Sequence, residues 1–81
     1  MNANERAALR EVRNPILSLP NAAALQAMPP EVRAALRAVL KDISADARQR
    51  AEKAWRTHKA PMAAYWKACA VYAGHIARVL K

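Results

Sequence analysis

The sequence predicts an all-α protein, with a short N-terminal helix followed by an antiparallel helical hairpin, three to four helices in all. Alanine is abundant, phenylalanine is absent and there is a single glycine, a composition that favours helix and offers little to a β-sheet. Two long stretches also place apolar side chains at three- and four-residue steps, the period of an α-helix. The 81 residues make one domain (1–81), near the size at which a single core only marginally stabilises a fold.

Residues 1–29 predict short helices and an apolar connector. Asn4 stands before an acidic first turn and is the expected N-cap of the first helix. This helix ends near Asn14, because Pro15 disfavours helical backbone in the residue before it.

The stretch NPILSLPN, residues 14–21, is bracketed by two prolines and predicts an extended connector. Its three large apolar side chains are too hydrophobic for a free linker, so we expect it to lie against the helices or against another subunit. Asn21 then caps one or two further turns, through Met28.

Residues 30–59 predict the long helix, which ends near His58. Pro30 suits the first helical turn, where a missing N–H costs nothing, and Glu31 follows where the helix dipole favours negative charge. One face is traced by Val32, Leu36, Val39, Leu40, Ile43, Ala47, Ala51, Ala54 and Trp55. Its alanine half would let a partner helix approach closely, until Trp55 fills the gap at the end.

Pro61 interrupts the helical pattern, since it removes a backbone donor and discourages helix at Ala60. Either the chain turns back here, or one long helix kinks. We prefer the turn, because Pro61 is well placed as the first residue of a new helix and the preceding helix is already long. Trp55, Tyr65 and Trp66 are then expected to pack inward and seal the closed end of the hairpin.

Residues 61–81 predict the C-terminal helix. Its broad apolar face holds Met62, Tyr65, Trp66, Cys69, Tyr72, Ala73, Ile76, Val79 and Leu80, and a narrow opposite stripe holds Lys67, Gly74, Arg78 and Lys81. Apolar side chains span roughly 200° of this helix, about twice the width that one packed neighbour needs. We therefore expect a second covering partner, and a homodimer.

Positive charge is concentrated in the second half of the chain. The net charge is +8, of which residues 47–81 carry +7 together with all four aromatic side chains. Arg33, Arg37, Lys41 and Arg48 share one flank of the long helix. We expect a contact surface around the 55–67 turn, formed by Arg48, Lys53, Arg56, Lys59 and Lys67.

Three classes of partner fit such a surface. The first is nucleic acid or a complex that handles it, because counterion release favours cations against phosphates. The second is an acidic protein surface, bound without nucleic acid, as small inhibitors and adaptors of phages and mobile elements do. A membrane-surface helix is a weaker third interpretation, since the apolar face of the last helix is needed for packing in so small a domain.

No enzyme, cofactor or metal site is predicted. There is no phosphate-binding glycine loop, carboxylate pair or nucleophile–base arrangement, and Cys69 lacks an adjacent base. Two histidines and one cysteine fall short of a zinc set. The charged N-terminus, MNANERAALREVR, is unlike a signal peptide, and charges interrupt the apolar C-terminus, so we expect no membrane insertion and a cytoplasmic location.

Overall fold

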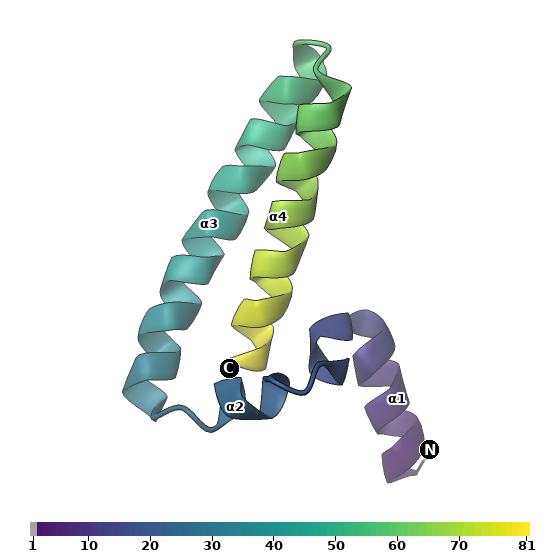
Figure 1. Ribbon diagram of the computed structural model, residues 1–81, viewed down its shortest axis with the longest axis vertical. Coiled ribbons are helices and arrows are strands. Elements are labelled where there is room, and N and C mark those ends of the chain that lie inside the picture. The colour runs from purple at the N-terminus through teal and green to yellow at the C-terminus, as the bar shows by residue number, and fades with distance from the viewer. Residues whose placement is uncertain (1) are drawn as a thin grey trace.

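The chain doubles back between residues 56 and 60, so a turn before Pro61 is confirmed over a kink (Figure 1). The computed structural model describes residues 2–81. Its elements in chain order are α1 (Ala3–Arg13), the 3₁₀ helix η1 (Pro15–Ser18), α2 (Ala22–Gln26), α3 (Pro30–Arg56) and α4 (Ala60–Val79). Residues 2–81 contain no strand. The all-α class and the hairpin of two long antiparallel helices are therefore confirmed.

The turn is built by a left-handed residue at the end of α3. His58 has a φ of 61°. Its N–H donates to the Trp55 carbonyl at 3.2 Å, and the Lys59 N–H donates to the Ala54 carbonyl at 2.8 Å. This pair of bonds is the Schellman motif, which satisfies the last carbonyls of a helix and reverses the chain. Pro61 then lies in the first turn of α4, where its missing N–H costs nothing.

Small side chains form the seam between α3 and α4. The buried residues are Ser44, Ala47 and Ala54 on α3, and Ala63, Ala70, Ala73 and Ala77 on α4. They recur at steps of three, four and seven residues, the spacing that keeps one seam facing a partner helix. The Ser44 hydroxyl donates to the Ala70 carbonyl at 2.7 Å, so this side chain bridges directly to the backbone of α4.

The seam takes up the alanine part of the apolar face that the pattern of α3 predicts, because Ala47 and Ala54 are buried, and this agrees with the expected close approach of a partner helix at the alanines. Val32, Val39 and Ile43 belong to that predicted face, yet each is about half exposed. Both helices carry apolar arcs wider than one neighbour covers, and alanine and serine allow the closest backbone approach, so they take the contact. The larger side chains are left on the flank.

The N-terminal segment differs in three details from the expectation. Asn21 precedes α2 but forms no side-chain capping hydrogen bond, and α2 ends at Gln26 rather than Met28. Asn2, rather than Asn4, caps α1, and its side chain forms a capping box with Glu5. The connector forms η1 rather than an extended strand, because the Asn14 side chain accepts the Ile16 N–H at 3.2 Å and closes a local turn.

Asn14 also ties the connector to the hairpin. Its side-chain amide donates to the His75 carbonyl of α4 at 2.9 Å, and Ile16 and Leu17 are half-buried. The expected packing of the connector against the helices is thus confirmed. By contrast, α1 has no buried residue and projects away from the hairpin (Figure 1).

Candidate functional site

Most positive side chains of the protein have no acidic partner. The sequence holds 14 Lys and Arg against 6 Asp and Glu, and the part of the chain that the structure describes contains one ion pair, Arg50 to Asp46 at 3.1 Å. That pair is exposed and contributes little to stability. The remaining cations form no ion pair within residues 2–81, and among them Arg33 donates to the Met28 carbonyl at 3.0 Å.

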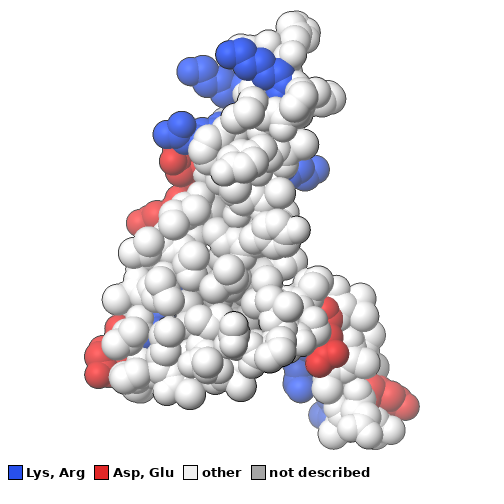
Figure 2. Space-filling view, viewed as in Figure 1, with Lys and Arg blue, Asp and Glu red and all other residues white. Residues whose placement is uncertain are grey.

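The five cations predicted around the turn lie on different sides of the hairpin. Lys53 and Lys59 line one hollow with Trp66, while Arg56 lies at the tip of the turn beside His58. The face of the hairpin in Figure 2 accordingly shows Lys and Arg side chains gathered at the closed end.

Two of the five predicted cations, Lys67 and Arg48, line other hollows. Lys67 lines a hollow with Trp55 and Glu52. Arg48 lines a groove in the half of the hairpin nearer its open end, which it shares with Gly74. The predicted surface is thus divided among several concave regions rather than gathered on one face.

The groove that contains Arg48 holds more cations than the other hollows described here. It encloses about 430 Å³ between α3 and α4 and is lined by Arg37, Lys41, Ser44, Ala45, Arg48, Gly74, Ala77, Arg78 and Lys81. We call it the basic groove, because five of these residues are cationic and none is acidic. Here the cationic flank of α3 meets the polar stripe of α4, two features that the sequence shows separately.

Small residues line the middle of the basic groove: Ser44, Ala45, Gly74 and Ala77. A Cβ atom placed on Gly74 would lie 3.5 Å from the Ser44 Oγ, an ordinary van der Waals contact. On the rim, the Arg37 Nε is buried and has no hydrogen-bond partner within residues 2–81. An unsatisfied buried donor costs free energy, which an acceptor brought by a ligand would recover.

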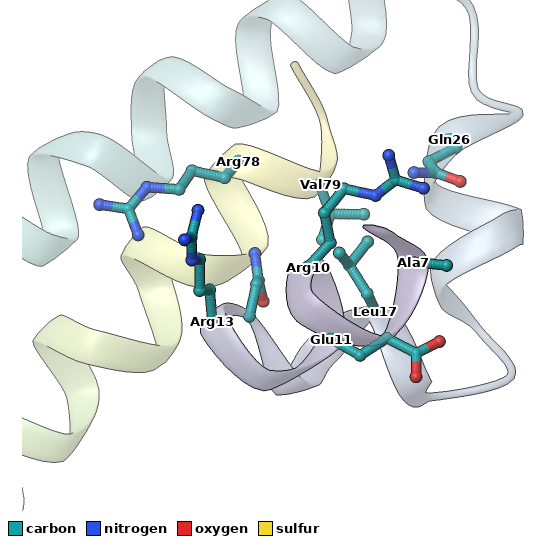
Figure 3. A pocket seen from close by; sticks show the side chains of 9 residues that line it. Ala7, Arg10, Glu11, Arg13, Leu17, Gln26, Arg78 and Val79 are labelled. Carbon is teal, nitrogen blue, oxygen red and sulfur yellow. The ribbon is translucent and has the colours of Figure 1, made fainter. Parts of the chain in front are cut away.

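Further cations adjoin the basic groove on the side of α1. A second hollow, of about 580 Å³, is lined by residues of α1, η1, α2 and α4, among them Arg10, Glu11, Arg13 and Arg78. Figure 3 shows Arg13 of α1 and Arg78 of α4 among the side chains that line this hollow. Arg78 borders both concave regions, so positive charge continues from the basic groove toward α1.

The aromatic side chains do not seal the closed end, contrary to the expectation. Trp55 is 69% exposed and Tyr65 is 58% exposed. Only Trp66 is partly packed: it meets Tyr65 edge to face with 5.2 Å between ring centroids, and the Arg50 guanidinium lies 5.2 Å above its ring. Ala54 and Ala63 bring the helices too close at this end to leave room for an indole between them.

No protein-family model, curated protein or solved structure matches this chain. None of the helices in residues 2–81 has a stretch both long and apolar enough to cross a bilayer. Among the same residues, no three His, Cys, Asp or Glu side chains converge as metal ligands would, and Cys69 is a free, half-buried thiol.

Proposed function

We propose that this protein is a non-catalytic binding protein whose helical hairpin contacts nucleic acid, alone or within a complex that handles nucleic acid. The observation that carries the proposal is the excess of unpaired cations: a net charge of +8 with one ion pair in residues 2–81. Phosphates that meet such side chains release condensed counterions, and this release drives much of the affinity of proteins for nucleic acid.

An acidic protein surface is the alternative partner, since the same cations would steer encounters with it. The two partners differ in what their affinity depends on. Binding to nucleic acid requires no second protein and weakens by a predictable factor for each phosphate contact as salt rises.

Salt titration of the purified protein with labelled nucleic acid tests the proposal. We expect micromolar binding at low salt, measured by fluorescence anisotropy, with the logarithm of the affinity falling linearly with the logarithm of salt concentration. The expected slope is about −0.7 per phosphate contact on a single strand and about −0.9 on a duplex. An uncharged polymer of similar length is the negative control. Absence of binding to both nucleic acids at low salt would overturn the proposal and favour the acidic protein.

We also propose that two copies of the chain associate through an apolar face of the hairpin. Val39, Ile43, Tyr65 and Tyr72 remain 47–60% exposed after the helices pair. The face in Figure 2 is largely uncharged along the middle of the hairpin. Monomeric proteins rarely leave so much apolar surface in water. Sedimentation of the protein at tens of micromolar tests this association.

A further inference from the structure

We infer that one face of the hairpin binds single-stranded nucleic acid, with phosphates in the basic groove and an unpaired base stacked on Trp55. The inference rests on the proposed function and narrows it to one ligand and one face. It follows from three observations: the alignment of the residues, the charge of the groove, and the exposure of the Trp55 indole.

The residues concerned share one face of each helix. Lys41, Arg48 and Trp55 follow one another at seven-residue steps on α3, and Lys67, Gly74 and Lys81 do so on α4. Seven residues make nearly two full turns, so each set projects in one direction. Trp55 and Lys67 line one hollow, while Arg48, Gly74 and Lys81 line the basic groove. The two concave regions therefore open on the same side of the hairpin.

The length of this face suits a short stretch of one strand. Lys41 and Trp55 are separated by about 21 Å along the helix, at 1.5 Å per residue. Each strand of a duplex carries a charge about every 3.4 Å and an unstacked single strand is more extended, so up to roughly six nucleotides span the distance between them. A strand held at both points thus meets the basic groove and the indole together.

The basic groove supplies the phosphate contacts. Its five cations face no acidic side chain of the lining. Arg37 also holds a buried Nε without a partner. When this side chain turns toward a phosphate oxygen, the nitrogen gains an acceptor and the guanidinium gains a counter-charge.

Trp55 selects a single strand over a duplex. Its indole is 69% exposed, and unlike Trp66 it has no aromatic or cationic neighbour among the interactions of residues 2–81. Bases within a duplex are already stacked on one another, whereas an unpaired base offers a free face to an aromatic ring. Glu52 is the one acidic residue that lines either hollow of this face, and it lies in the hollow of Trp55 and Lys67. Its negative charge would repel phosphates.

Removal of the indole tests the stacking step. With a labelled oligothymidine of about 16 nucleotides at low salt, Trp55→Ala should weaken binding by about 5- to 100-fold. Val12→Ala is the control, because Val12 is 78% exposed on α1 and lines neither hollow of this face; it should change the affinity by less than about twofold. In a Trp66→Phe background, oligothymidine should quench the fluorescence of Trp55 as it saturates the protein.

Charge reversal tests the basic groove. The double variant Lys41→Glu, Arg48→Glu should weaken binding by more than about tenfold and lower the salt slope by about 0.7 per lost contact. Lys53→Glu, Lys59→Glu changes the net charge equally on the hollow with Trp66 and should have a much smaller effect. Glu52→Gln should strengthen binding. All five substituted positions are exposed, and circular dichroism checks that each variant remains helical.

The outcomes separate this inference from the proposed function. If the unchanged protein binds neither single strand nor duplex, the proposed function fails. If it binds but prefers duplex, or Trp55→Ala binds as tightly as the unchanged protein, the inference fails and the proposed function stands. Equal losses in the two double variants would show attraction by net charge alone, and would likewise overturn the assignment to this face.

Discussion

A single residue, His58, determines the geometry of the turn between α3 and α4. Its φ of 61° lies in the left-handed region, where most side chains cost free energy because Cβ crowds the backbone. The position corresponds to the one that glycine most often occupies at helix ends. The sequence expectation that His58 helps to end the helix is compatible with this placement, but the chain accepts backbone strain there.

Replacement of His58 by glycine should stabilise the protein. The strain removed is about 1–2 kcal/mol, and the extra freedom of glycine in the unfolded chain offsets about 0.5–1 kcal/mol of it. We expect a net gain of up to about 1 kcal/mol, measured as a higher urea midpoint with an unchanged slope. His58→Val is the contrasting variant and should lower the midpoint. A glycine variant less stable than the original would show that the imidazole itself makes a stabilising contact.

The pairing of helices α3 and α4 depends on buried side chains that are too small to form a large core. The buried apolar residues are alanines apart from Val79 and Leu80, so each contributes little transfer free energy. Close helix approach supplies dispersion contacts instead. The Ser44 hydroxyl adds a buried hydrogen bond to the Ala70 carbonyl, which fixes the position of one helix along the other.

A larger side chain in the seam between α3 and α4 should therefore lower the free energy of unfolding. Ala47 is 2% exposed, and Ala47→Leu would force the helices apart, at about 1–3 kcal/mol for an overpacked site. Ala38→Leu makes the same change on the exposed side of α3 and should alter the free energy of unfolding by no more than about 0.5 kcal/mol. Urea unfolding at one protein concentration compares them. Similar midpoints for both variants would contradict the assignment of Ala47 to the helix contact.

The whole molecule is elongated, with extents of 45 × 31 × 19 Å, and its core is small. Small chains bury a low fraction of their surface and gain stability from partners. The flank of Val39 and Ile43 and the exposed tyrosines of α4 give the hairpin an apolar face to share. Such association would bury side chains that the seam leaves in water.

The dimer is tested by sedimentation at tens of micromolar, where we expect a species of twice the chain mass. Val39→Gln combined with Ile43→Gln removes apolar area from the shared face and should shift the protein toward monomer. Ala34→Gln combined with Ala38→Gln, on exposed positions of the same helix, is the control and should leave the mass unchanged. The melting temperature of a dimer also rises with protein concentration. A monomer at every concentration, for the unchanged protein, would remove the proposal.

Local signals determined the elements. Alanine content, the prolines at positions 15, 30 and 61, and the three- and four-residue apolar steps predict where α3 and α4 lie and that the chain turns between them, because these effects act within a few residues. The cap of α1 was misplaced by two residues, since Asn2 and Asn4 are chemically equivalent candidates. The folded connector was missed because one Asn14 side chain closes it.

The sequence alone thus determined the helical class, the hairpin and the position of the cationic stripes on each helix. The sequence also indicated close approach at the alanines of α3, whereas only the tertiary structure showed that Ser44 joins this seam, that the larger apolar residues and Trp55 stay exposed, and that two separate stripes meet in the basic groove. Helical periodicity fixes directions around one helix, whereas the rotation of one helix against another depends on how closely their backbones approach, which no single helix encodes.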